Sequence, residues 1–136
     1  MQIIVVEDSA SDVYLLKQAL NEHIGSYQLQ VIKDGTQAIA FIESSPPETV
    51  NPPPDLFILD LNLPGYHGLD VLRRLKQHQL FKTTPVVIFT SSSAPDERQE
   101  GKRLGANCFL RKPTDLDAFI AVGECVKRCY EDAVNR

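Results

Sequence analysis

The chain lacks any apolar run long enough to cross a membrane, and it has no block of lysines or arginines. A membrane-spanning helix needs about 20 consecutive apolar residues, so we expect no membrane partner. Nucleic-acid backbones are bound by clustered cations, and the net charge of −4 argues against a nucleic-acid partner as well. The start of the chain shows no secretory signal pattern. We therefore expect a cytoplasmic protein.

Cysteine is scarce too. The three cysteines, Cys108, Cys125 and Cys129, are odd in number and include no Cys-x-x-Cys pair. Cys125 and Cys129 would share one face of a helix, where a two-ligand metal site is conceivable. Cysteines of this kind more often act as small buried hydrophobic residues. We expect that role here, in a reducing cytoplasm.

Short apolar runs alternate with stretches of helical spacing throughout the 136 residues, which we expect to form a single domain spanning 1–136. The runs predict strands at 3–6, 27–31 (an edge strand), 55–59, 85–89 and 107–110. Helices are predicted over 10–22, around 38–42, over roughly 66–78, from 95 to near 105, and after a cap at Thr114. This order predicts an α/β fold, a flavodoxin-like doubly wound three-layer sandwich with a parallel sheet of strand order 2-1-3-4-5.

Two local signals add detail. Ser9, followed three residues later by Asp12, resembles a capping box at the start of the first helix. Residues 44–54 hold five of the nine prolines, which predicts a surface connector that is neither helix nor inner strand. A ligand for a proline-binding domain is the alternative for this segment.

Residues with chemical roles follow the strands. Glu7 and Asp8 follow the first strand, Asp60 the third, and Lys112 the fifth, while Thr90 directly follows the residues predicted for the fourth. The carboxyl ends of parallel strands meet at one edge of a sheet, so we expect these side chains to be neighbours.

Such a group of side chains suits metal-assisted phosphoryl transfer. Carboxylates held close together either gain a raised pKa or bind a cation. An all-oxygen set without a histidine or cysteine cluster favours Mg²⁺, or alternatively Mn²⁺. An ammonium and a hydroxyl suit the remaining phosphate oxygens, and a carboxylate between them can attack phosphorus to form an aspartyl phosphate.

These residues and their neighbours make the chain similar to a known family. Over essentially its whole length it resembles the receiver domains of two-component response regulators. The fragments that carry the resemblance are Val6-Glu7-Asp8, residues 59–65 (LDLNLPG) with Gly68, residues 87–91 (VIFTS), Gly105-Ala106-Asn107 and Lys112-Pro113. The opening residues and the proline-rich segment look most like stand-alone regulators paired with phytochrome-type histidine kinases.

The resemblance implies a phosphoacceptor and a metal site. Asp60 would accept a phosphoryl group from the phosphohistidine of a sensor histidine kinase, or from a small donor such as acetyl phosphate. Asp8 and Asp60 would ligate Mg²⁺ together with the backbone carbonyl of Asn62, and Glu7 would act largely through water.

It also implies a switch. Lys112 would pair with the phosphoryl group, and a cis peptide before Pro113 would aim it there. Thr90 would move toward the new oxygens, and Phe109 would turn inward behind it. Tyrosine is common at this position, and because phenylalanine has no hydroxyl the switch would work by packing alone; an ordinary core residue is the alternative for Phe109. Three further positions would tune metal affinity and phosphoryl lifetime: Glu7, Asn62 and Ser92.

The receiver domain would use the whole chain, leaving no output domain. Output would then pass to a downstream protein, or to a His-phosphotransfer domain in a relay. The family's usual signalling surface would comprise the helix from 95 to near 105, the strand at 107–110 and the last helix. We expect a homodimer there, with three candidate contacts: Phe119, Cys125 and Tyr130.

Two other functions compete with this one. A haloacid-dehalogenase-type phosphohydrolase needs a second Asp two residues after the nucleophile, and Asn62 cannot serve there as a general acid. The protein would therefore be a stoichiometric phosphoacceptor with slow self-dephosphorylation rather than an enzyme. A phosphorylation-independent binding module is the other alternative. The histidines, His23, His67 and His78, are interpreted as surface residues, with His67 near enough to the site for a minor influence.

Overall fold

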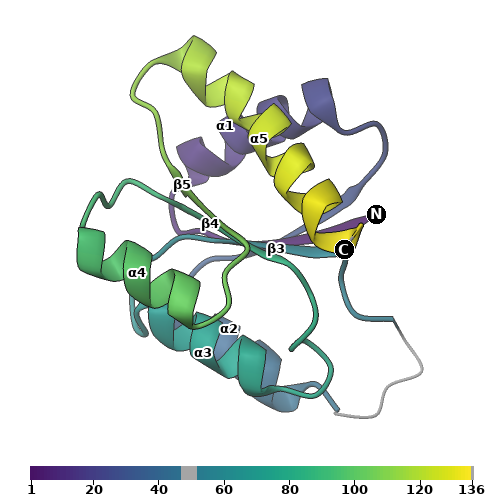
Figure 1. Cartoon of the computed structure of the whole chain (residues 1–136), viewed down its shortest axis with the longest axis vertical. Coiled ribbons are helices and arrows are strands. Elements are labelled where there is room, and N and C mark those ends of the chain that lie inside the picture. The colour runs from purple at the N-terminus through teal and green to yellow at the C-terminus, as the bar shows by residue number, and fades with distance from the viewer. Residues whose placement is uncertain (47–51, 136) are drawn as a thin grey trace.

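The computed structural model describes residues 1–46 and 52–135, and within them the predicted α/β architecture is confirmed (Figure 1). One parallel sheet has the strand order β2-β1-β3-β4-β5. The strands are β1 (Gln2–Val6), β2 (Gln28–Ile32), β3 (Leu56–Leu59), β4 (Val86–Thr90) and β5 (Cys108–Arg111). The helices are α1 (Ala10–His23), α2 (Gly35–Ser44), α3 (Gly68–Gln77), α4 (Pro95–Arg103) and α5 (Leu116–Val134).

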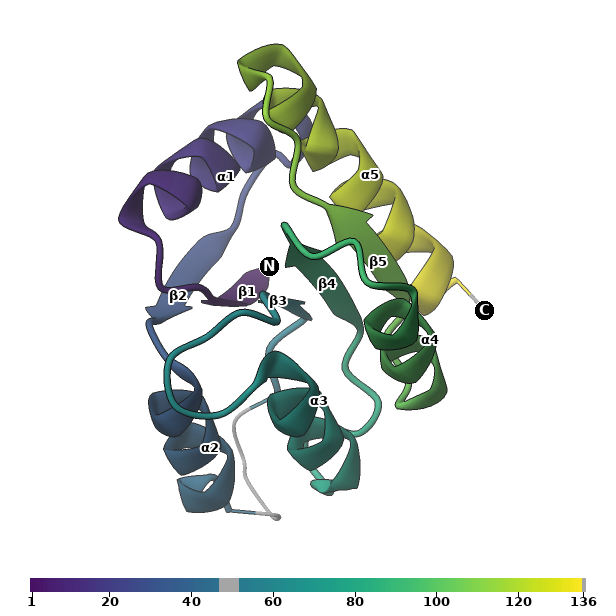
Figure 2. The same ribbon diagram turned by 90° about the vertical axis from the view of Figure 1, so that its left-hand side faces the viewer.

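The helices cover both faces of the sheet. Helices α1 and α5 pack on one face, and α2, α3 and α4 lie on the other (Figures 1 and 2). Alternate residues of β1 belong to the two resulting cores: Ile3 and Val5 pack toward α1 and α5, whereas Ile4 and Val6 pack toward α2 and α3. Strand β3 is buried on both faces, which accounts for its unbroken apolar sequence.

The register of the sheet aligns the strand ends that matter. Val6 pairs with both Ile32 and Leu59, and Leu59 is flanked by Ile88 on its other side. The residues that follow Val6 and Leu59 therefore leave the sheet at the same edge. Strand β2 lies at the border of the sheet, as predicted from its half-polar pattern, although it runs one residue later than expected.

The helix starts were predicted with mixed success. Oγ of Ser9 accepts a hydrogen bond from the Asp12 N–H at 3.2 Å, which confirms the first cap. The prediction for the last helix was wrong, because Asp115 rather than Thr114 caps α5, accepting from the Ala118 N–H at 3.3 Å. Both residues are good cap types, so the sequence alone did not distinguish them. Ser44, predicted to lie in the proline-rich connector, instead ends α2, and residues 47–51 of that connector lie outside the described part of the chain.

The prediction that the cysteines act as small buried residues in a reducing environment is confirmed only for the burial of Cys129. Cys108 on β5 and Cys129 on α5 form a disulfide, with their Cα atoms 6.3 Å apart, and Cys125 is free and exposed. Alternation along β5 turns Cys108 toward the face that α5 covers, where Cys129 is buried. A metal site shared by Cys125 and Cys129 is excluded in this form, since Cys129 is already bonded.

Two further expectations are corrected by burial. Phe119 is not on a surface: its ring packs edge-on against Phe89, with centroids 5.3 Å apart, inside the core beneath α5. His78 is half-buried rather than a free surface residue, with Nε2 2.9 Å from the Ser45 carbonyl oxygen and its ring against Phe81. Among the described residues, no helix combines the length and the apolar character needed to span a membrane.

Candidate functional site

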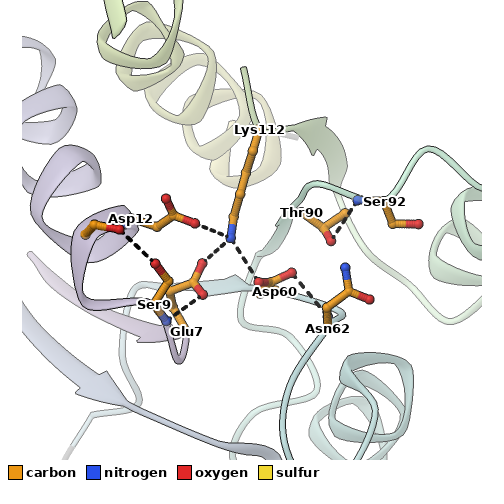
Figure 3. A network of polar contacts seen from close by, with 9 residues as sticks. Glu7, Ser9, Asp12, Asp60, Asn62, Thr90, Ser92 and Lys112 are labelled. Atoms are coloured by element: carbon orange, nitrogen blue, oxygen red, sulfur yellow. Dashed lines mark hydrogen bonds and ion pairs between the residues drawn. The ribbon is translucent and has the colours of Figure 1, made fainter. Parts of the chain in front are cut away.

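The residues predicted for the site meet at the carboxyl edge of the sheet. Glu7 and Asp8 leave β1, Asp60 follows β3, and Thr90 is the last residue of β4. Lys112 follows β5 and reaches across the edge toward the carboxylates (Figure 3). The convergence expected from the parallel topology is therefore present.

The ammonium group of Lys112 is the centre of the cluster. It donates to Oε1 of Glu7 at 2.5 Å, to Oδ2 of Asp12 at 2.8 Å and to Oδ2 of Asp60 at 2.9 Å. An ammonium has three hydrogens, so each can serve one carboxylate. The Lys112 side chain is only 9% exposed, and one cation thus faces three carboxylates away from most of the solvent.

The charges of this cluster shift two pKa values. Burial raises the pKa of Glu7 to about 7; the hydrogen bond from Lys112 opposes the shift, and the charge of Asp60 adds to it. Burial alone lowers the pKa of Lys112, but hydrogen bonds to Asp12, Glu7 and Asp60 outweigh it and leave this pKa above its ordinary value. Lys112 is therefore a permanent cation at neutral pH, whereas Glu7 exchanges its proton in that range.

Three acidic side chains form a group that could hold a metal ion. Glu7, Asp8 and Asp60 each offer one carboxylate oxygen, and these atoms all lie within 4.8 Å of one another. Glu7 and Asp60 are buried, whereas Asp8 is exposed, so the group has a solvent-facing side. An oxygen-only donor set of this kind fits a hard divalent cation such as Mg²⁺.

Asp60 is held by the loop that follows it. Its Oδ1 accepts from the backbone N–H of Asn62 at 3.2 Å, and the Asn62 side chain is exposed (Figure 3). The N-terminus of α3 packs tightly behind: the Gly68 N–H donates to the Leu61 carbonyl at 3.0 Å. A Cβ at Gly68 would lie 2.3 Å from the Asp60 carbonyl oxygen, which explains why glycine is needed at that position.

Thr90 and Phe109 lie on the same face of the sheet. Thr90 is fully buried, and its Oγ1 accepts from the Ser92 N–H at 3.3 Å. Phe109 pairs with Ile88, two residues before Thr90, so side-chain alternation places it toward α4 as a diagonal neighbour. The Phe109 ring is half-buried, with the guanidinium carbon of Arg98 on α4 lying 5.8 Å from its centroid.

One carboxylate of the cluster was not predicted as a site residue. Asp12 was interpreted as a partner in a capping box, but its side chain turns to Lys112, and the Ser9 N–H donates to Oε2 of Glu7 instead. The available signal was its position in the first turn of α1, four residues after Asp8, which sets it above the same edge. A cis peptide was expected before Pro113, but the described residues contain no cis peptide; Lys112 reaches the carboxylates through the trans form, which X-Pro bonds ordinarily favour.

Comparison with known proteins gives a consistent result. A family model described as the response regulator receiver domain matches residues 3–123. The chain is 36% identical over 132 residues to the response regulator Rcp1 of Synechocystis sp., covering 97% of this chain and 90% of that protein. The crystal structure of the Mn²⁺-bound form of Rcp1 has a TM-score of 0.81 at 32% identity, covering 93% of this chain and 91% of its own. The crystal structure of the phosphorylated cyanobacterial phytochrome response regulator RcpA has a TM-score of 0.83 at 28% identity, covering 95% of this chain and 92% of its own.

Proposed function

The chain belongs to the response regulator receiver domain family, and we propose that it receives a phosphoryl group on Asp60 from a histidine kinase in a Mg²⁺-dependent reaction. One observation carries this proposal. Asp60 belongs to the acidic group with Glu7 and Asp8, and its Oδ2 also lies 2.9 Å from the Lys112 ammonium. A carboxylate between a cation site and a fixed ammonium is suited to attack phosphorus.

The transfer would be a simple substitution at phosphorus. A carboxylate oxygen of Asp60 forms the new P–O bond while the P–N bond of the kinase phosphohistidine breaks, and the imidazole keeps the electron pair. Lys112 would turn from the carboxylate to the incoming phosphoryl oxygens and offset their charge. Glu7, Asp8, Asp60 and the Asn62 carbonyl would hold Mg²⁺ or Mn²⁺, which neutralises charge on the phosphoryl group when bound. The Mn²⁺-bound Rcp1 and the phosphorylated RcpA, both similar to this chain, support the metal and the modification.

The response would be a change of conformation rather than catalysis of a further reaction. Thr90 would turn toward the phosphoryl oxygens, and the ring of Phe109 would move inward behind it by packing alone. The position of Thr90 and Phe109 on the same face of the sheet supports this coupling. Residues 1–136 would act as one receiver unit and as a stoichiometric phosphoacceptor that loses its phosphoryl group slowly, at a rate tuned by Glu7, Asn62 and Ser92.

The partners follow from the same proposal. The donor would be a sensor histidine kinase, of the phytochrome type in view of the similarity to RcpA. The receiver of the signal would be a downstream protein or a His-phosphotransfer domain. A homodimer through α4, β5 and α5 would use Cys125 and Tyr130, since Phe119 is buried.

The test is the intact mass of the protein after incubation with acetyl phosphate and Mg²⁺. We expect one added phosphoryl group on the native chain, none without the metal and none on Asp60→Asn. Asp117→Asn, which changes an exposed acid at the start of α5, is the matched control and should be labelled like the native protein. If neither an adduct nor release of inorganic phosphate is detected, the proposal fails and the phosphorylation-independent binding module takes its place.

A further inference from the structure

A series of side-chain contacts joins the loop after β3 to the loop after β4, beside the acidic cluster. Nε2 of His67 lies 2.7 Å from Oε2 of Glu97, although 30 residues separate them. The other carboxylate oxygen of Glu97 accepts a hydrogen bond from Oγ of Ser92. The backbone N–H of Ser92 donates to Oγ1 of Thr90 at 3.3 Å, so the series ends on a residue of the site (Figure 3).

The orientation of His67 is fixed from its other ring nitrogen. Nδ1 accepts a hydrogen bond from the Leu69 N–H at 3.0 Å, because His67 is the N-cap of α3. In the neutral ring the proton therefore sits on Nε2, where it can be donated only outward, toward Glu97. The cap thus aims the His67 ring at α4.

Ser92 is held from two sides. Its Oγ donates to Glu97 and accepts from the Ala94 N–H at 3.3 Å. Glu97 lies in the first turn of α4, and its side chain is 24% exposed against 41% for His67, so the contact is partly shielded from water. While His67 holds Glu97, the loop that follows Thr90 is held to the loop that follows Asp60.

We propose that His67 and Glu97 are positioning residues which, with Ser92, form a latch that sets how readily Thr90 responds to phosphorylation. This inference rests on the proposed phosphorylation of Asp60. The latch, defined as the His67–Glu97–Ser92 contacts, favours the loop arrangement in which Oγ1 of Thr90 faces the Ser92 N–H.

The thermodynamic consequence has a definite sign. A phosphoryl group at Asp60 shifts the equilibrium between the two loop positions only by the difference in its binding free energy to Thr90 in the moved and unmoved positions. Contacts that stabilise the unmoved position subtract from that difference, and by reciprocity they weaken binding of a phosphoryl mimic. Partly exposed side-chain contacts to a carboxylate shift an equilibrium about two- to fivefold. Breaking the latch should therefore tighten binding of the mimic by about two- to fivefold.

Variants of His67 can separate the latch from the helix cap. In His67→Asn the short side chain keeps an acceptor near the position of Nδ1 and remains a good cap, but it no longer reaches Glu97. In His67→Gln the longer amide reaches Glu97 and restores the donor. Glu97→Ala removes both contacts. Asp96→Ala removes a neighbouring exposed first-turn acid and is the matched control.

The experiment titrates beryllofluoride, an aspartyl-phosphate mimic, into the full chain with Mg²⁺. We expect tighter binding in His67→Asn and Glu97→Ala, native affinity in His67→Gln and Asp96→Ala, and no further gain in the double variant of His67→Asn with Glu97→Ala. Non-additivity is expected because Glu97→Ala already breaks the His67–Glu97 contact that His67→Asn removes. Unchanged or weaker binding in the two single variants, or fully additive effects, would overturn the latch.

Amide hydrogen exchange of residues 91–94 supplies a readout that needs no phosphorylation. Faster exchange in His67→Asn and Glu97→Ala, with native exchange in His67→Gln, is expected if the contacts hold the loop. Equal exchange in all variants would overturn the proposal, whatever Asp60 does. If the native chain bound no beryllofluoride while the exchange changed as expected, the proposed function and the control of Thr90 by the latch would both be refuted. Only the finding that the His67–Glu97–Ser92 contacts hold the loop would stand.

Discussion

The ammonium of Lys112 lies 2.9 Å from Oδ2 of Asp60, although 52 residues separate them in the chain. The same ammonium also contacts Glu7 and Asp12. Without a bound cation, the balance of charge at this edge therefore depends strongly on Lys112. A phosphoryl group or a metal ion would have to enter a network in which the Lys112 ammonium already contacts three carboxylates.

Removing the Lys112 charge should destabilise the metal-free protein. Lys112→Met leaves Glu7, Asp12 and Asp60 facing one another without their common cation. Loss of one partner of a buried ion pair costs about 3–5 kcal/mol, and proton uptake by the carboxylates should limit the loss here to about 3 kcal/mol. Urea unfolding followed by circular dichroism with a chelator present measures it. Lys102→Met, an exposed change on α4, should cost little, and equal effects of the two changes would contradict the prediction.

The stability of the protein should depend on pH through the ionisation of Glu7. Its pKa rises from 4.5 to about 7 on folding, so the folded state holds this proton more tightly than the unfolded state. The contribution of this tighter proton binding to the free energy of unfolding is complete below pH 4.5 and is lost as the pH rises through about 7. In metal-free buffer, the free energy of unfolding of the native chain should fall relative to Glu7→Gln between about pH 5 and about pH 8. Glu22→Gln, on the exposed side of α1, is the matched control; a constant difference for Glu7→Gln would refute the assignment.

The strands and the site were predictable because their signals are local or follow from topology. Each buried strand is an apolar run, and a parallel sheet brings the residues after Val6 and Leu59 to one edge whatever the details of packing. Contacts made by helices were not predictable in this way. The Asp12 carboxylate turning to Lys112 and the burial of Phe119 depend on how α1 and α5 sit over the sheet.

The same limit applies to the loops that flank the site. His67 and Glu97 lie on different elements, and nothing in their spacing shows that they meet. The disulfide between Cys108 and Cys129 likewise joins an edge strand to the last helix across 21 residues. Partners of this kind become visible only once the packing is known.

Replacing Gly68, which packs against the backbone of Asp60, should lower both the stability of the fold and the labelling of Asp60. In Gly68→Ala the new Cβ would lie 2.3 Å from the Asp60 carbonyl oxygen and 2.5 Å from Cα of Leu61. Both neighbours are backbone atoms, so α3 or the end of β3 must shift, and overpacking of this kind costs about 1–3 kcal/mol. Labelling by acetyl phosphate should fall as well, because Asp60 moves. Gly25→Ala is the matched control: nothing lies within 4 Å of the new Cβ, so stability should stay level or rise by up to about 1 kcal/mol. Native stability and labelling in Gly68→Ala would show that the contact is easily relieved.

The cysteines should differ sharply in reactivity, and their bond should stabilise the fold. Without reductant, an alkylating agent should add one group to the folded chain, at the exposed Cys125, and three groups after reduction and unfolding. Closing a loop of 21 residues between Cys108 and Cys129 restricts the unfolded chain, which corresponds to about 3 kcal/mol in the chain-entropy model. Reduction, or the paired change of Cys108 and Cys129 to Ser, should therefore lower the free energy of unfolding by about that amount. Cys125→Ser, one helical turn from Cys129, should leave it unchanged and remove the single adduct. More than one adduct on the untreated folded protein would mean that the bond between β5 and α5 does not form in solution.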